Sequence, residues 1–147
     1  MMQIPDQIKM QINNLLYKYE AYLAEKSGYA LPNDVWERIW KDSAAKSIEH
    51  VFPQDINSED WKGKFGSNEE AKVLCHRLGN LILIPPEVNS KLGNQSFLDK
   101  KIIYGECSYL RMIREIAEQD EWNIRTLNDR ELKILEWAES YWKINAH

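Results

Sequence analysis

The chain has 147 residues, of which 44% are hydrophobic, and a formal net charge of −4. The length fits one domain with a proper hydrophobic core, whereas the acidic balance argues against a protein that coats nucleic acid without specificity. No apolar run approaches the roughly 20 residues of a membrane span, the N-terminus has no signal-peptide pattern and the two cysteines lack metal-binding spacing, so we expect a cytoplasmic protein with no membrane contact.

The first half of the chain predicts two helices, one strand and a long loop. Apolar residues recur at helical spacing over residues 3–26, and a short helix follows over 34–41. A β-branched and apolar run over 46–52 predicts a strand, which the next proline ends because proline donates no ladder hydrogen bond. Residues 53–66 are polar and contain glycine, so we expect a loop that Trp61 pins to the body.

The second half predicts one more strand among several helices. Ser67 and Glu70 form a capping box at the start of a helix. Residues 81–84 are all apolar, which indicates a strand buried on both faces, and Pro86 can open the following helix. Helical patterns continue over 96–104, 108–120 and 128–144. The fold class is therefore α+β and mostly helical, around one small two-stranded antiparallel sheet.

Inward and outward faces can be predicted for the later helices. In the helix over 96–104, Phe97 and Ile102 are expected to face inward. The last helix is expected to begin after Asn128 as the N-cap, with Glu131 completing a capping box. Its amphipathic pattern rests on six apolar residues, Leu132, Leu135, Trp137, Ala138, Tyr141 and Trp142.

Four polar residues beside the two predicted strands are candidates for a phosphodiesterase site. Hydrolysis needs a base to activate water, positive charge on the developing phosphorane and help for the leaving oxygen. His50 fits the base, because a neutral imidazole is well populated near pH 7. Glu49 and Asn89 supply oxygens for Mg²⁺, which takes only one or two protein carboxylates and otherwise binds water and phosphate. Asn80 would orient the imidazole or tie the loop.

Three lysines, Lys91, Lys100 and Lys101, are candidates for phosphate contacts as point charges, although a solvated face is the ordinary alternative. Because consecutive strand residues face opposite sides, Glu49 and His50 can point to one site only if the strand twists or bulges before its end. His76 adjoins Cys75, but neighbours on a helix point apart, so both are interpreted as structural.

The order of several motifs resembles the HNH, or ββα-metal, nuclease domain at the C-terminus of GmrSD-type restriction proteins. The segments are IEHVFPQ at 48–54, HRLGNLILI at 76–84, NS at 89–90 and FLDK at 97–100, and LLYKYE at 15–20 resembles the helix that precedes that domain. HNH families place the middle Asn nine residues before the final metal-binding residue, and 89 − 80 = 9 here. Each fragment is a weak signal, whereas their order and spacing are fairly specific.

The resemblance implies a role for each candidate residue. His50 matches the general base, Glu49 and Asn89 match the ligands of Mg²⁺ or Mn²⁺, Asn80 matches the middle Asn, and Lys100 matches a basic position after the helix. DNA is then the expected substrate, in a restriction or anti-phage defence system.

The resemblance also implies an organisation for the chain. A ββα-metal core over about 46–95 would lie between helical flanks over 3–41 and 96–144, within a single domain over 1–147. Related full-length proteins carry a ParB-like nucleotide-hydrolysing domain, to which nothing in this sequence corresponds, so a separate domain or subunit of that kind is an expected partner.

Two other functions stay open at the level of sequence. The aromatic content and acidic charge also fit a catalytically inactive helical adaptor that binds a partner protein or DNA, and divalent-metal binding at Glu49 and Asn89 would count against it. A nuclease that acts on RNA is the third possibility, which a competition assay would separate from one that acts on DNA.

Overall fold

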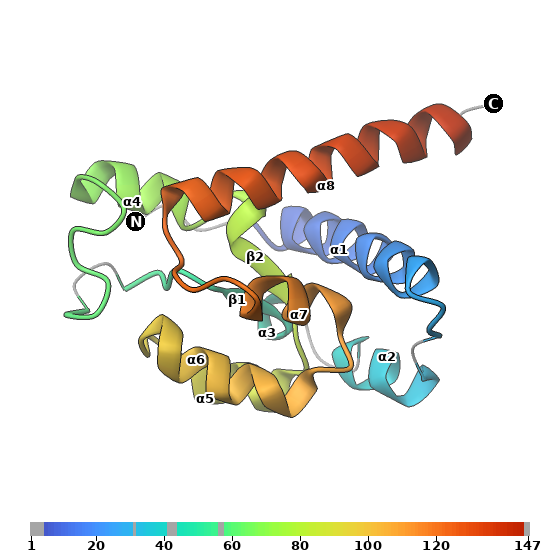
Figure 1. Cartoon of the computed structure of the whole chain (residues 1–147), viewed down its shortest axis with the longest axis horizontal. Helices are drawn as coiled ribbons and strands as arrows, with labels where there is room; N and C mark the ends of the chain where they lie inside the picture. The colour runs from blue at the N-terminus through green and yellow to red at the C-terminus, as the bar shows by residue number, and fades with distance from the viewer. Residues whose placement is uncertain (1–4, 31, 41–43, 56–57, 146–147) are drawn as a thin grey trace.

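The two strands lie between helices in the computed structural model, which describes residues 5–30, 32–40, 44–55 and 58–145. In Figure 1, α1 and α8 cover one side of the strands, and α5 and α6 lie on the opposite side. The elements are α1 Asp6–Lys26, α2 Asn33–Trp40, α3 Ala44–Ser47, β1 Ile48–His50, α4 Asn68–Leu74, the 3₁₀ helix η1 Leu78–Asn80, β2 Leu81–Leu83, α5 Pro86–Leu92, α6 Phe97–Tyr104, the 3₁₀ helix η2 Gly105–Cys107, α7 Arg111–Ala117 and α8 Ile124–Asn145. The predicted α+β, mostly helical fold class is confirmed.

The sheet is a single antiparallel pair, as predicted. Glu49 pairs with Ile82, and the register runs from Ile48↔Leu83 to His50↔Leu81. The whole of β2 is buried, as its unbroken apolar run indicated. The predicted first strand was too long, because the residues directly before β1 form the short helix α3.

The loop between β1 and α4 is held by aromatic residues at its centre. Trp61 is buried, and its Nε1 donates a hydrogen bond of 2.8 Å to the Gln95 carbonyl oxygen. The rings of Phe52 and Phe65 stack with their centroids 3.9 Å apart. Trp61 therefore fastens the loop to the segment between α5 and α6, which confirms the predicted role, and the capping box of Ser67 and Glu70 begins α4 as expected.

The last helix begins earlier than predicted. Asn123 caps it: its Oδ1 accepts a hydrogen bond of 3.0 Å from the Thr126 backbone N–H, and the Asn123 N–H donates to Thr126 Oγ1 at 2.8 Å. This reciprocal pair does the work of a capping box with Thr in place of Glu, so the expected N-cap at Asn128 is wrong. The buried side chains of α8 follow helical spacing at Leu127, Arg130, Ile134 and Trp137.

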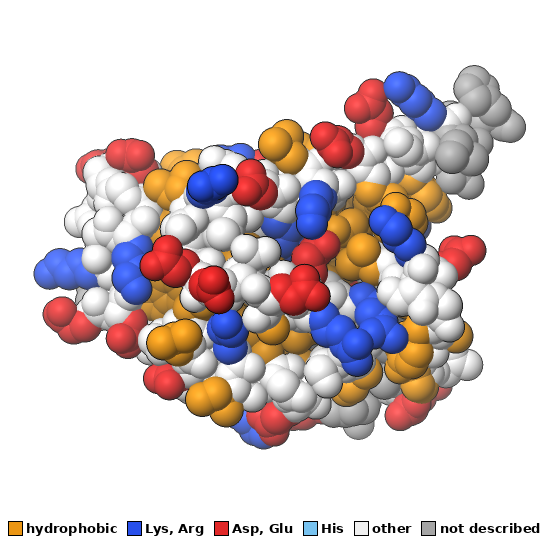
Figure 2. All heavy atoms as spheres, viewed as in Figure 1, with side chains coloured by type: hydrophobic (Ala, Val, Ile, Leu, Met, Phe, Trp, Pro, Cys, Tyr) orange, Lys and Arg blue, Asp and Glu red, His pale blue; other side chains and the backbone are white. Residues whose placement is uncertain are grey.

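Some predicted inward faces are also wrong. Ile102 on α6 is 76% exposed, whereas Phe97 is buried as expected. On α8, three residues of the expected apolar face are at least half exposed, namely Leu132, Leu135 and Trp142. Acidic and basic side chains are interspersed on the face of the molecule shown in Figure 2, so the net negative charge is not gathered there.

Candidate active site

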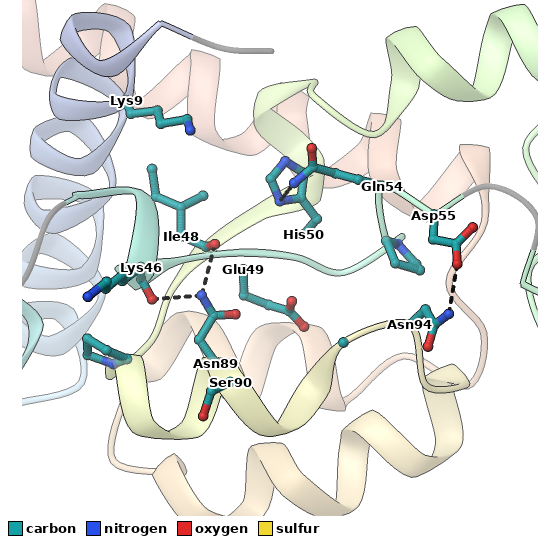
Figure 3. A pocket seen from close by; sticks show the side chains of 13 residues that line it. Lys9, Lys46, Ile48, Glu49, His50, Gln54, Asp55, Asn89, Ser90 and Asn94 are labelled. Atoms are coloured by element: carbon teal, nitrogen blue, oxygen red, sulfur yellow. Dashed lines mark hydrogen bonds between the residues drawn. The ribbon is translucent and has the colours of Figure 1, made fainter. Parts of the chain in front are cut away.

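A cleft of about 790 Å³ runs along the outer edge of β1, the edge that does not pair with β2 (Figure 3). It is lined by residues of α1, α3, β1, the segment after β1, α5 and the turn after α5. The side chains that matter for chemistry are those of Lys9, Lys46, Glu49, His50, Gln54 and Asn89. The structure thus brings together three of the four polar candidates, and Asn80 is not among the described residues that line the cleft.

Glu49 and His50 reach the cleft from a regular strand. Their pairing with Ile82 and Leu81 continues without a bulge, and they lie on opposite sides of the β1 ribbon in Figure 3. Both line the cleft because it follows the strand edge rather than one face of the sheet. The bulge that the sequence led us to expect is therefore unnecessary.

Asn89 is held by the edge of the sheet. Its Nδ2 donates hydrogen bonds to the backbone carbonyl oxygens of Lys46, at 2.7 Å, and Ile48, at 3.2 Å. Because both amide hydrogens are used in this way, the carboxamide oxygen faces away from the strand, and it lies on the side of Glu49 in Figure 3. Pro86 begins α5 and so places Asn89 in the first turn, beside β1.

Glu49 is buried and tightly held. Its Oε2 accepts hydrogen bonds from Lys100 Nζ at 3.1 Å and from the Tyr104 hydroxyl at 2.9 Å. Burial raises the pKa of Glu49, and the ammonium of Lys100, the two side-chain hydrogen bonds and a backbone hydrogen bond from His50 oppose that change. Oε2 is thus held by two side chains of α6, and the Glu49 carboxylate lines the cleft, where it can ligate a cation.

Lys100 has a structural role, so the predicted phosphate contact is wrong. The side chain is fully buried, and its ammonium also donates to the carbonyl oxygens of His50 at 2.9 Å and Val51 at 3.1 Å. An ammonium has three N–H donors, and three protein oxygens occupy them. Lys100 therefore supplies hydrogen-bond donors to carbonyl oxygens along the unpaired edge of β1, and its positive charge balances the carboxylate of Glu49.

The other two predicted phosphate contacts also lie outside the cleft. Lys91 forms an exposed ion pair with Glu106 at 3.1 Å. Lys101 donates a hydrogen bond of 2.9 Å to the Gln119 carbonyl oxygen. Neither belongs to the described lining of the cleft, where the basic side chains are instead Lys9 of α1 and Lys46 of α3. The amphipathic pattern of α1 gave no sign that Lys9 faces a site.

Asn80 is buried, it links separate segments of the chain by hydrogen bonds, and it does not contact His50 in the described structure. Its Oδ1 accepts from the Phe52 N–H at 2.8 Å and from Trp122 Nε1 at 2.9 Å. Its Nδ2 donates to the carbonyl oxygens of Phe52 and Cys75, both at 2.9 Å. Of its two expected roles, the structure supports tying the loop and contradicts orienting the imidazole directly.

His50 is contacted at both ring nitrogens. Its Nε2 lies 3.3 Å from His76 Nδ1, and its Nδ1 lies 3.5 Å from Gln54 Nε2. Burial lowers the pKa of His50 to about 3, and positive charge from His76, Lys100 and Lys9 adds to this effect. The imidazole is therefore neutral near pH 7 and carries a lone pair that can accept a proton, although its pKa lies well below the working pH at which a general base is most effective. Sequence reasoning treated His76 as structural and missed this contact, which depends on tertiary placement.

The donor atoms of the cleft fit a hard cation that keeps much of its water. Among the described residues, no group of three or more His, Cys, Asp and Glu side chains could hold a metal ion, which does not fit a closed zinc site. One carboxylate oxygen of Glu49 and one amide oxygen of Asn89 fit Mg²⁺, whose remaining positions water and phosphate can fill.

Comparison with known families gives one match. Residues 5–137 match the family described as the C-terminal domain of GmrSD restriction endonucleases. No curated protein and no solved structure matches the chain. Within the described part of the chain, no helix has the length and apolar character to cross a membrane. Because the match spans most of the chain, this protein belongs to the GmrSD restriction endonuclease C-terminal domain family.

Proposed function

We propose that the chain is an HNH-type, Mg²⁺- or Mn²⁺-dependent endonuclease domain that hydrolyses DNA phosphodiester bonds in restriction or anti-phage defence. The observation that carries the proposal is the convergence of Glu49, His50 and Asn89 on one cleft. The family supports a nuclease role in general, and the pattern of donors supports the finer assignment. A ParB-like nucleotide-hydrolysing domain or subunit is the proposed partner.

Each residue of the cleft has a distinct task in this proposal. His50 takes the proton from the attacking water, since its imidazole is neutral. The Glu49 carboxylate and Asn89 Oδ1 would hold the cation, which when bound would supply positive charge to the phosphate oxygens. Lys9 and Lys46 line the cleft and bind flanking phosphates of the DNA backbone as point charges.

The test is cleavage of plasmid and modified DNA by purified protein with Mg²⁺ or Mn²⁺. His50→Ala should lower the rate on the order of 10²- to 10⁴-fold, the usual contribution of a general base, while circular dichroism stays unchanged. Lys9→Ala should weaken DNA binding, because it removes a cation from the cleft. Lys91→Ala is the matched control, since it removes an exposed lysine of α5 outside the cleft, and it should leave cleavage unaltered.

Two results would contradict the proposal. One is the absence of cleavage of any DNA, with and without a ParB-like partner domain. The other is full activity of His50→Ala. Absence of cleavage together with absence of Mg²⁺ binding by calorimetry would favour the inactive adaptor instead. Preferential cleavage of RNA in a competition assay would favour the RNA-directed alternative.

A further inference from the structure

We infer that His76 is a positioning residue for His50, which it holds in the tautomer that presents the Nδ1 lone pair to the cleft. The catalytic meaning of this inference rests on the proposed function, whereas the tautomer itself does not. The two histidines are 26 residues apart in the sequence, and His76 lies in the turn between α4 and η1.

The contact between the rings has a defined geometry. His50 Nε2 and His76 Nδ1 are 3.3 Å apart, and the rings meet nearly edge to face, with centroids 5.2 Å apart and planes at 84°. One ring nitrogen therefore points at the other, as a hydrogen bond between imidazoles requires. Both rings are partly buried, so this contact competes with few water molecules.

The surrounding structure holds both backbone segments in place. The buried amide of Asn80 bonds the N–H and C=O of Phe52, two residues after His50, and the carbonyl oxygen of Cys75, the residue before His76. The His76 N–H donates to the Val73 carbonyl oxygen at 3.2 Å. The fully buried side chain of Asn80 thus holds the two backbone segments together and thereby sets the spacing between the two imidazoles.

The neighbours of His50 select one tautomer. Gln54 presents its amide nitrogen, which can only donate, to His50 Nδ1 at 3.5 Å. Nδ1 must then carry the lone pair, so the proton resides on Nε2 and is donated to His76 Nδ1. The opposite tautomer would place two donors face to face at Gln54. With Nε2 occupied by His76, Nδ1 is the nitrogen left for the cleft, and a water molecule that displaces the Gln54 amide from it can pass its proton to Nδ1.

The first experiment reads the tautomer directly by long-range ¹H–¹⁵N correlation NMR of the full chain at neutral pH. The chain has three histidines, so single substitutions assign the signals. We expect His50 to be protonated at Nε2 in the wild type and in His76→Asn, which keeps an oxygen acceptor near the position of Nδ1. His76→Leu lacks the acceptor, and only the long, exposed contact of 3.5 Å with Gln54 still favours this tautomer, so both nitrogens should shift toward averaged values. His76→Ala removes the same acceptor and carries the test if His76→Leu does not fold.

The second experiment measures cleavage with the same variants. His76→Leu should lower kcat by about 10- to 100-fold, as is typical when the partner that orients a functional group is lost, with little change in KM. His76→Asn should recover most of the rate. A wild-type His50 protonated at Nδ1, or an unchanged tautomer in both His76→Leu and His76→Ala, would overturn the inference. A wild type that shows the expected tautomer but cuts no DNA would overturn the proposed function alone.

Discussion

At the scale of single residues, the ion pair of Glu49 and Lys100 fixes the position of the carboxylate at the cleft. Both side chains are almost fully buried, and such pairs are costly to desolvate. Here the ammonium also satisfies two carbonyl oxygens of an edge strand, which would otherwise be left without partners. The pair therefore contributes mainly by holding the Glu49 carboxylate in a fixed position beside the cleft.

This arrangement predicts the outcome of removing the ammonium. Lys100→Met should lower the free energy of unfolding by about 3–5 kcal/mol, because it leaves the Glu49 carboxylate and the two carbonyl oxygens buried without their donor. Urea denaturation measures the change. Lys101→Met, at the next position on α6, is the control and should have a much smaller effect. If Lys100→Met kept full stability and lost only affinity for DNA, the phosphate contact would be correct after all.

The same residues show what sequence alone can and cannot predict about the site. That Glu49, His50 and Asn89 lie at one cleft was predictable, because each stands in a local motif and the order of β1, β2 and α5 brings the motifs together. The environment of Lys100 was not, since a lysine that caps a strand edge has the same local sequence as one on a solvated face. His76 was missed for a similar reason: its partner is set by the tertiary position of a turn.

At the scale of elements, a helix or strand was predicted well where its limits depend on local sequence, and poorly where they depend on contacts with distant residues. Long apolar periodicity predicted α1, and an unbroken apolar run predicted β2. The start of α8 was wrong because Asn123 and Thr126 cap it in place of the expected pair. The helix α7 begins at Arg111 without a side-chain cap of its own, and no local pattern could reveal what replaces it.

The missing cap of α7 comes from α1. Glu20 is fully buried, and its two carboxylate oxygens accept hydrogen bonds of 2.8 Å from the backbone N–H groups of Arg111 and Met112. These are donors that a helix leaves unpaired in its first turn. The hydrogen bonds favour the ionised carboxylate, but burial is the larger effect and raises the pKa of Glu20 from 4.5 to about 7.

A carboxyl with a raised pKa makes stability depend on pH in a defined direction. The native state binds the proton more tightly than the unfolded state, so the contribution of Glu20 is complete below pH 4.5 and is lost as pH rises toward about 7. The loss amounts to up to about 3 kcal/mol, because one pKa unit corresponds to about 1.4 kcal/mol. Glu20→Gln cannot ionise, so the stability of the wild type relative to this variant should fall between pH 4.5 and 7 and stay constant above.

Urea denaturation of both proteins at pH 5, 6, 7 and 8 tests this dependence. Glu25→Gln, at an exposed position of the same helix, controls for the change in charge. The raised pKa would be contradicted if the free energy of unfolding of the wild type, relative to that of Glu20→Gln, stayed constant across this range or rose with pH.

At the scale of the whole molecule, side chains of α8 bond directly to the segment that leads into β2. From α8, Arg130 donates to the carbonyl oxygens of Gly79 and Leu81 at 3.0 and 2.7 Å, and Glu131 accepts from the Gly79 N–H at 3.2 Å. A Cβ on Gly79 would lie 2.3 Å from the Leu127 carbonyl oxygen, so the glycine permits this close approach.

We therefore expect the core over 46–95 and its flanks to fold as one unit and not independently. A peptide limited to residues 46–95 loses Lys100 and Tyr104, which hold Glu49, and Trp122, which bonds Asn80. A two-stranded hairpin is marginal in water without such packing, and a chain of this size buries too little surface to compensate. We expect the peptide to give the circular dichroism and narrow NMR dispersion of an unfolded chain, and to be cut rapidly by proteases.

The full chain is the control for that experiment, and it should resist the same protease concentration. Adding Mg²⁺ should not fold the peptide, because only Glu49 and Asn89 would ligate the cation, whereas metal-driven folding relies on a closed set of protein ligands. A cooperative thermal transition of the 46–95 peptide would show instead that the ββα unit is autonomous, and that α1, α6 and α8 merely cover a site already formed without them.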